Sequence, residues 1–392
     1  MMLEVLHEKV LSVYFSSDDM HFIWNRNWNM TELEIDKLFE LRIDYVTIIG
    51  LFVLAMLFSI ALHELSHAFY FGINKVPLRF VAIFLFGFYK DNKKCKYIFY
   101  PNKITLTGGI AIPDLPAINS ESQFKKIRKI YSRALLFAPI ISFVEAIVAV
   151  VAYSTLLFSG ISTKNTNVSV FLVFCIFVGL TIFFSSFLKA ENIYGDFPAY
   201  KLYKENDKLT ILQFGQYLIF ANNWKQKIMD SDWLVDEILQ YVRKINDEPG
   251  DSTNLGMLDW LIQMEYLGVF ELDDGINGTL KSMFEEDKIL SEYPQSEERD
   301  IFYYHMVYKL LKDGQVEKCV LQEIMNRSSK KLLKGMPSNE YYTKLTKHLL
   351  YDCDYADWLN KNMNPSSSFT LLGLFEPVRE IERRIIQQKE EK

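Results

Sequence analysis

Hydrophobic residues are unevenly distributed along the 392-residue chain. Before residue 200 they form three long runs, at 45–72, 132–158 and 168–188. A helix needs about 20 apolar residues to cross the hydrocarbon core of a bilayer. The first run reaches that length only if it includes HELSH at residues 63–67. The pattern predicts three membrane-spanning helices, and we extend the third to residue 200.

The segment between the first two runs has a different pattern. VPLRFVAIFLFGFY, KCKYIFY and KITLTGGIAI are rich in β-branched and aromatic residues, with Gly and Asn between them. Such segments are typical of short strands, and we predict a membrane-associated β-hairpin over 79–112. Only residues 159–167 separate the second run from the third, so these two runs form a helical hairpin.

The rest of the chain is more polar and suggests three parts: an N-terminal segment (1–43), a membrane-embedded core (44–204) and an α-helical domain (205–392). In the last part, two amphipathic helices are expected to join at Lys312-Asp313-Gly314. The expected fold class is a mainly α polytopic membrane protein, with a three-helix core, a small β-hairpin region and a soluble helical domain.

Charge indicates the orientation. Lys and Arg are concentrated in 73–131, whereas the loop 159–167 has one lysine. The positive-inside rule therefore places 73–131 and 205–392 in the cytoplasm and 1–43 outside. The net charge of −6 argues against a nucleic-acid partner. The three apolar runs indicate that membrane lipid surrounds part of the chain. Usage rich in Lys, Ile, Asn and Phe is typical of a low-GC bacterium, so we expect a bacterial plasma membrane.

Candidate chemistry lies in HELSH, at the end of the first apolar run. H-E-x-x-H on a helix puts two imidazoles on one face, so His63 and His67 could bind one Zn²⁺. The glutamate next to the first histidine, Glu64, could then act as general base toward a water molecule activated by the metal. Ionisable groups in a membrane helix are costly and usually functional. The pattern predicts a zinc metalloprotease.

Zinc needs a third protein ligand and an open position. The candidate carboxylates are those of Asp114, Glu145, Glu191 and Asp196. We place His63 about 13 Å from the inner end of the first span and Glu145 about 20 Å from the same side. The inner end of the third span is level with the histidines, which favours Asp196. Gly195 and Pro198 can break the helix there and direct its carboxylate inward.

Several motifs together resemble the site-2 protease family of intramembrane zinc metalloproteases, over about residues 45–205. These motifs are HELSHA followed by Gly72, the turn Phe84–Gly87 (FLFG), a second glycine pair Gly108-Gly109, and LFAPIISF with Pro139. Ala138 and Ser142 replace the glycine and asparagine of the family's second-helix motif. Asp196 matches the aspartate of the third-helix motif, although Asn192 and Pro198 stand at other offsets and Phe197 replaces a glycine.

The resemblance implies that Glu64 is catalytic and that His63, His67 and Asp196 bind zinc. It implies a membrane-anchored protein or peptide as substrate, held extended against the hairpin at 80–112 and cleaved near the cytoplasmic face. Further candidates for contacts with the substrate or with the ligands are Gly87, Gly108, Gly109, Pro139, Ser142, Glu145 and Asn192. The domain 205–392 is expected to bind a protein regulator or to select the substrate.

Two alternatives remain open. CAAX-type membrane metalloproteases also carry H-E-x-x-H and use a distal glutamate as third ligand, a role that Glu145 or Glu191 could fill. The altered motif around Asp196 also leaves room for a catalytically inactive membrane scaffold that binds a partner through its helical domain.

Overall fold

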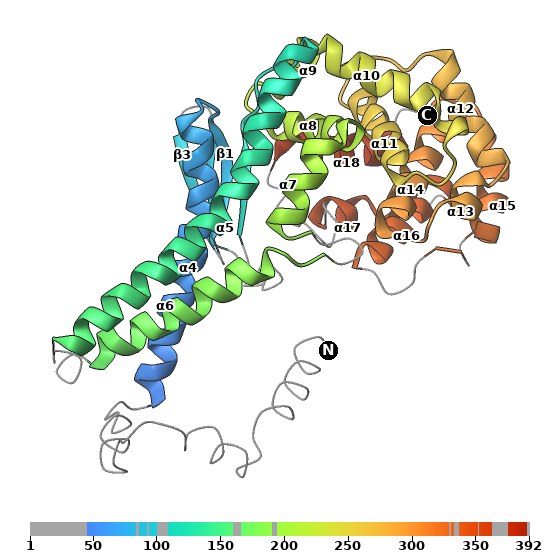
Figure 1. The fold of residues 1–392 in the computed structure, drawn as a ribbon. Helices are drawn as coiled ribbons and strands as arrows, with labels where there is room; N and C mark the ends of the chain where they lie inside the picture. The colour runs from blue at the N-terminus through green and yellow to red at the C-terminus, as the bar shows by residue number, and fades with distance from the viewer. Residues whose placement is uncertain are drawn as a thin grey trace.

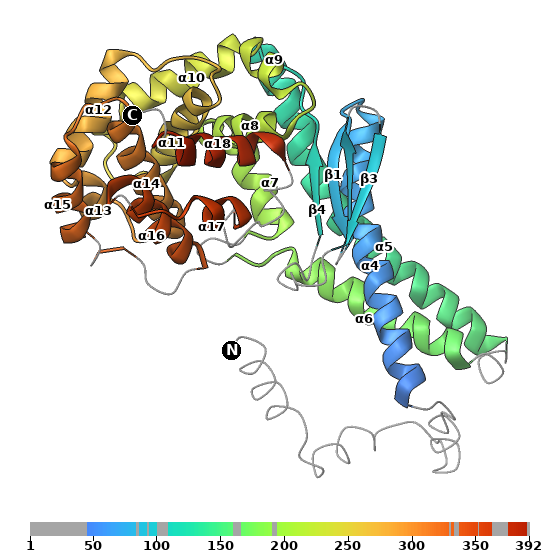
Figure 2. The ribbon, with the colours of Figure 1, turned by 180° about the vertical axis from the view of Figure 1, so that it is seen from behind.

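The computed structural model describes residues 45–83, 86–91, 94–99, 109–159, 166–189, 194–328, 331–332, 337–351, 353–362 and 375–389. A bundle of long helices forms one end, an array of shorter helices forms the other, and a small sheet lies between them beside the longest helix (Figures 1 and 2). The predicted segment 1–43 lies outside the described residues.

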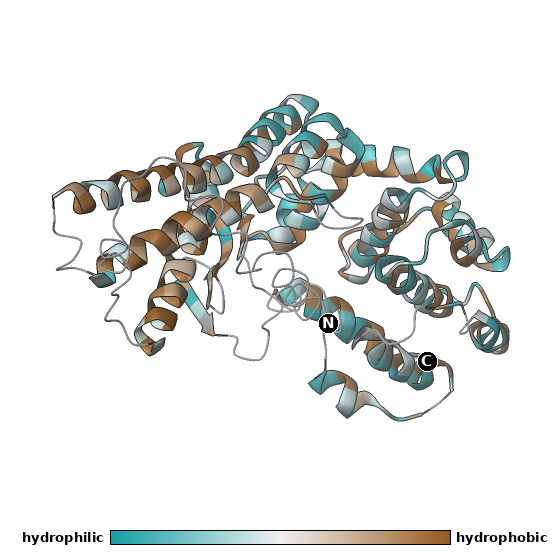
Figure 3. Ribbon diagram, turned by 60° about the horizontal axis from the view of Figure 1, so that its bottom comes forward, coloured by the Kyte–Doolittle hydropathy of each residue, from teal (hydrophilic) through white to brown (hydrophobic). Residues whose placement is uncertain are grey.

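Three helices are long and apolar enough to cross a membrane: α4 (Tyr45–Ile73), α5 (Glu121–Phe158) and α6 (Thr166–Ser185). Hydrophobic residues are concentrated on them, whereas the other helices mix polar and apolar residues (Figure 3). The prediction of three such helices is confirmed, with two differences in their bounds.

The first difference is the start of α5, which we expected at residue 132. The helix begins eleven residues earlier, after the N-cap Ser120, whose side chain accepts a hydrogen bond from the Gln123 amide. Hydropathy marks only the part of a helix that lipid surrounds. The additional turns are polar on one side and bury Phe124, Ile127 and Tyr131 on the other, so they belong to the same helix.

The second difference is the end of the third span, expected at residue 200. α6 ends at Ser185, and α7 (Asp196–Glu205) is a separate helix. The start of α7 lies against the end of α6, because the Gly195 amide bonds to the Leu188 carbonyl and the Phe197 amide bonds to the Ser186 carbonyl. A Cβ at Gly195 would lie 2.5 Å from the Ser186 carbonyl oxygen, so this close approach of the two backbone segments requires glycine.

The sheet is larger than the predicted hairpin. Its strands are β1 (Leu78–Ile83), β2 (Phe86–Asp91), β3 (Lys94–Phe99) and β4 (Gly109–Pro113), in the order β3-β2-β1-β4, and all pairs are antiparallel. β1 and β4 pack against α4. The outer side of β4 pairs with no other strand among the described residues. Such an edge can accept an added strand.

The C-terminal half is helical, as predicted. Its elements are α8 (Asp207–Phe220), α9 (Trp224–Met229), α10 (Asp232–Arg243), the 3₁₀ turn η1 (Ile245–Asp247), α11 (Ser252–Tyr266), α12 (Asp274–Glu285), α13 (Lys288–Glu292), α14 (Glu297–Lys312), α15 (Lys318–Ser328), α16 (Pro337–Leu350), α17 (Ala356–Lys361) and α18 (Glu376–Gln387). The predicted junction between α14 and α15 contains Gly314 with φ +65°, which favours glycine.

The helical half shares one hydrophobic core with the sheet and with the start of α5. Phe375 packs against Phe80 of β1 and Phe220 of α8, with ring centroids 6.1 and 4.8 Å away, and the Arg79 guanidinium lies 5.4 Å from its ring centroid. The predicted boundary at residue 205 therefore divides the sequence by composition, while packing continues across it.

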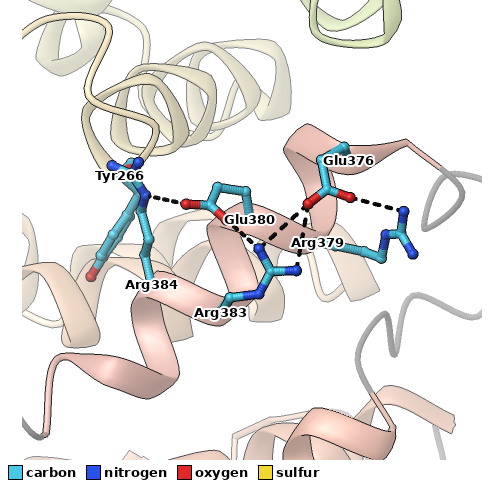
Figure 4. A network of polar contacts seen from close by, with 6 residues as sticks. All are labelled: Tyr266, Glu376, Arg379, Glu380, Arg383 and Arg384. Carbon is cyan, nitrogen blue, oxygen red and sulfur yellow. Dashed lines mark hydrogen bonds and ion pairs between the residues drawn. The ribbon is translucent and has the colours of Figure 1, made fainter. Parts of the chain in front are cut away.

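The last helix, α18, shows how the C-terminus is held. Its apolar side buries Ile381, Ile385 and Ile386. Its other side carries a network of Glu376, Arg379, Glu380, Arg383 and Arg384 (Figure 4). The Arg384 guanidinium also donates to the Tyr266 carbonyl at 2.8 Å, which ties α18 to the end of α11.

A buried polar cluster lies inside the helical half. His305 Nδ1 contacts the Asp259 carboxylate at 2.7 Å, and the Tyr341 hydroxyl donates to Glu382 at 2.7 Å. Burial alone lowers the pKa of His305, but the negative charges of Asp259 and Glu382 outweigh it and raise the pKa above its usual value. Burial also raises the pKa of Glu382, which His305 offsets only in part.

These shifts predict a pH-dependent stability. Both groups bind protons more tightly in the folded chain than in the unfolded chain, so the free energy of unfolding must fall as pH rises. We expect a lower midpoint of thermal unfolding at pH 8 than at pH 6 for the detergent-purified protein. His305→Gln should remove the contribution of His305 to this dependence whatever its effect on absolute stability, and an unchanged slope in that variant would contradict the assignment.

Candidate metal centre

The spacing of the two histidines of HELSH, four residues apart, places both imidazoles on one face of α4. The rings of His63 and His67 lie 5.1 Å apart, with an interplanar angle of 90°. Glu64 lies beside them, and all three residues are buried, with exposed fractions of 6–8%. Each offers a ligand-capable atom within 4.8 Å of the others.

Asp196 brings a carboxylate to the same point from another element. It is the first residue of α7, and its Oδ2 lies 3.0 Å from His63 Nε2 while its Oδ1 lies 3.8 Å from His67 Nε2. The backbone bonds of Gly195 and Phe197 to the residues that follow α6 make this possible, because they hold the start of α7 at the end of α6.

Helix α5 orients both imidazoles through their other nitrogens. His63 Nδ1 lies 3.0 Å from Ser142 Oγ, and His67 Nδ1 lies 2.9 Å from the Ala134 carbonyl oxygen. A carbonyl can only accept, so His67 Nδ1 carries the hydrogen and a neutral ring keeps a free lone pair on Nε2. Metal-binding histidines are commonly oriented in this way by their second nitrogen.

The donor set and its spacing fit zinc. Bonds of about 2.0–2.2 Å to imidazole nitrogen and carboxylate oxygen place neighbouring ligands of a tetrahedral ion about 3.4 Å apart. The two contacts of the Asp196 carboxylate, at 3.0 and 3.8 Å, lie on either side of that value. Two histidines and one carboxylate leave the fourth position open, as catalytic zinc sites require.

Gly109 is packed directly against Glu64. A Cβ at this position would overlap the Glu64 side chain and would lie 2.7 Å from the Ala82 carbonyl oxygen. The missing side chain therefore lets the start of the edge strand β4 lie next to Glu64. The sequence motif identified Gly109 as a candidate, and its close packing against Glu64 explains why glycine is needed there.

Gly109→Ala is expected to lower peptide hydrolysis about 100-fold without removing the metal. The methyl group must displace Glu64 or β4, and a misplacement of about 1 Å can have an effect of that size. Rates and metal content measured on the same preparation will separate the two effects. Gly50→Ala is the matched control, since nothing lies within 4 Å of its Cβ position. Parent-like rates for Gly109→Ala would contradict the expectation.

The other candidate carboxylates lie elsewhere or outside the described residues. Glu145 accepts a hydrogen bond from Ser59 at 2.5 Å, and its Oε2 has no partner within the part of the chain that the structure describes. Asp114 accepts bonds from Asn222 and Lys227 at the junction of the sheet with the helical half. Glu191 lies outside the described residues.

The remaining candidates are dispersed. Ser142 contacts His63, and Pro139 is buried in α5 between Ala134 and Ser142. Gly87 lies in β2, where it pairs with Ala82 of β1, and is not in the turn itself. Gly108 and Asn192 lie outside the described residues.

Two contributors were not identified from the sequence. The Ala134 carbonyl is backbone and leaves no signal in residue type. Arg128 of α5 binds the end of α7, and in the sequence it is only one of the basic residues in 73–131 that indicate orientation. A basic residue facing the last carbonyls of a helix is a recognisable pattern, but only once the helices are placed in space.

Three helices are long enough to cross a membrane, and a half-buried aspartate faces a buried cluster of two histidines and a glutamate. Together they indicate a membrane protein with the donor set of a metallopeptidase. The family model described as Peptidase family M50 matches residues 51–340, most of the chain, and the protein belongs to that family. The family points to a membrane metalloprotease. The match extends well into the helical half, beyond the motifs at 45–205. No curated protein and no solved structure matches the chain.

Proposed function

We propose that this protein is an intramembrane zinc endopeptidase that cleaves membrane-anchored proteins or peptides near the cytoplasmic face. The observation that carries the proposal is the position of the Asp196 carboxylate, which faces Nε2 of both His63 and His67 inside the helix bundle. In this proposal His63, His67 and Asp196 hold the ion. Zinc supplies Lewis-acid chemistry, polarising a carbonyl and activating water near neutral pH.

Glu64 is the residue that moves the proton. The Glu64 carboxylate is next to His63 on the helix. Asp196 contacts the two histidines and not Glu64, so Glu64 is left for proton transfer in this proposal. It can accept a proton from the attacking water and deliver it to the leaving amine nitrogen. Its burial beside β4 keeps bulk solvent away from this transfer.

The edge strand β4 is the proposed binding place for the substrate. A peptide bond inside a helix is shielded, so a membrane-anchored segment must unwind before hydrolysis. Addition to a free sheet edge holds a peptide extended through backbone hydrogen bonds. β4 begins at Gly109, against Glu64, so a strand paired with β4 would pass the proposed base.

The experiment is cleavage of single-span substrates by the purified protein in proteoliposomes. We expect cut sites in the cytoplasmic half of the span, identified by mass spectrometry, and loss of cleavage on chelation with recovery on addition of zinc. Candidate substrates can be found by comparing the membrane proteins that accumulate in cells carrying the parent or Glu64→Gln. Cleavage that persists after complete removal of the metal would overturn the proposal.

A helical half that binds a regulator is the second part of this proposal. It follows Asp196 directly in the chain and shares a core with the sheet and α5. A partner bound to it could change the position of α7 and hence of the third ligand. Because the core is shared, removal of 210–392 would expose the sheet and α5, and point substitutions are the better test.

A further inference from the structure

α7 carries Asp196 at its first residue and is only ten residues long. A helix is a stiff element, so the place of its last turn determines the place of its first. About 12 Å separates Lys204 from Asp196 along the axis at 1.5 Å per residue. Whatever holds the end of α7 therefore also holds the Asp196 carboxylate against the two histidines.

Arg128 of α5 holds that end. Its Nε donates to the Tyr203 carbonyl at 3.1 Å, its Nη2 donates to the Lys204 carbonyl, and its Nη1 pairs with the Asp207 carboxylate. The last carbonyls of a helix lack partners within the helix. A cation there also complements the negative end of the helix dipole. The Arg128 side chain is itself only 17% exposed, although the Asp207 carboxylate that it pairs with is 54% exposed.

Aromatic packing leaves α7 little freedom to turn about its axis. Tyr203 packs edge-to-face on Tyr131 of α5, with ring centroids 5.2 Å apart. The Tyr131 hydroxyl lies 3.0 Å from the Tyr217 hydroxyl of α8. These rings restrain rotation. The Thr210 hydroxyl of α8 also donates to the Tyr203 carbonyl at 2.9 Å, and Arg128 adds the bonds from α5 that limit sliding of α7 along its axis.

We infer that Arg128 is a positioning residue for the metal centre, fixing α7 so that the Asp196 carboxylate stays at Nε2 of His63 and His67. The inference rests on the proposed function, because it takes Asp196 as a zinc ligand. The same guanidinium bonds the first residue of α8, Asp207, so one side chain connects a membrane helix, the ligand-bearing helix and the helical half. Movement of α8 by a bound partner would reach Asp196 through it.

The test is the zinc affinity of the full-length protein in detergent, measured by competition with a chromophoric chelator. We expect Arg128→Ala to bind zinc about 10–100-fold more weakly, the range found when an outer partner of a metal ligand is lost. Arg128→Lys keeps the charge but not the planar fork of donors, and should fall between the two. The absorption bands of the cobalt-substituted protein should change with Arg128→Ala, because the aspartate ligand moves.

Lys125→Ala is the matched control, since Lys125 lies one turn earlier on α5 in an exposed pair with Glu121, and it should bind zinc like the parent. Parent-like affinity and cobalt bands in Arg128→Ala would overturn this inference and leave the proposed function standing. A parent that takes up no zinc would overturn both. If Arg128→Ala shows no thermal unfolding transition, Arg128→Lys carries the test, and parent-like affinity in that variant would overturn the inference.

Discussion

Glu64→Gln is expected to lower the rate of peptide hydrolysis about 100- to 10,000-fold, the usual contribution of a positioned general acid–base group, while zinc content stays at the parent level. The amide has nearly the same shape as the carboxylate and cannot take the proton. Asp196, His63 and His67 remain in place, because none of their contacts depends on Glu64. Single-turnover cleavage in proteoliposomes will measure the effect.

Glu121→Gln is the control for Glu64→Gln, since Glu121 is exposed in the first turn of α5 and far along the helix from the centre. Its rate should equal that of the parent. Retention of full activity, or of every cellular phenotype, by Glu64→Gln would favour the inactive scaffold that binds a partner.

Asp196→Ala is expected to lower the affinity for zinc by more than about 100-fold, the upper end of the effect of losing an outer partner, because this variant loses a direct ligand. Two imidazoles would remain, oriented by Ser142 and Ala134, without the Asp196 carboxylate that faces their Nε2 atoms. Elemental analysis of the purified protein after dialysis against a weak chelator will give zinc per chain. Activity should fall with it.

The other carboxylates provide matched comparisons for Asp196→Ala. Glu145→Ala should keep its zinc, because the Glu145 carboxylate bonds Ser59 and neither histidine. Glu191→Ala completes the set. Loss of zinc in either glutamate variant, with retention in Asp196→Ala, would assign the third ligand to that glutamate, as in CAAX-type enzymes, and not to Asp196. A parent without zinc after reconstitution would favour the scaffold.

The parts of the centre that were predictable depend on local geometry. The spacing of His63 and His67 fixes their common face whatever surrounds the helix. The length of the apolar runs fixes the number of candidate spans. The choice of Asp196 needed only the relative depth of the spans, and the structure brings it to the histidines despite the altered motif around it.

The parts that were not predictable depend on contacts between distant segments. The bond from His67 to the Ala134 carbonyl joins residues 67 positions apart, and the contact of Gly109 with Glu64 joins a strand to a helix. The start of α5 was missed because its first turns are polar. The extent of the sheet was underestimated because turn positions within a short apolar segment resist assignment by pattern.

The contact of Phe375 with Phe80 and Phe220 also bears on how such a protein can be rebuilt. Consider a chimera that joins the helical half of another family member to this membrane part. Its helical half would need an aromatic residue that packs on Phe80 of β1 as Phe375 does, or Phe80 would be left open to water. Because β1 pairs with β4, a poor fit there would loosen the strand beside Glu64. Exchange of specificity between relatives should therefore succeed when the sheet is transferred together with the helices that cover it.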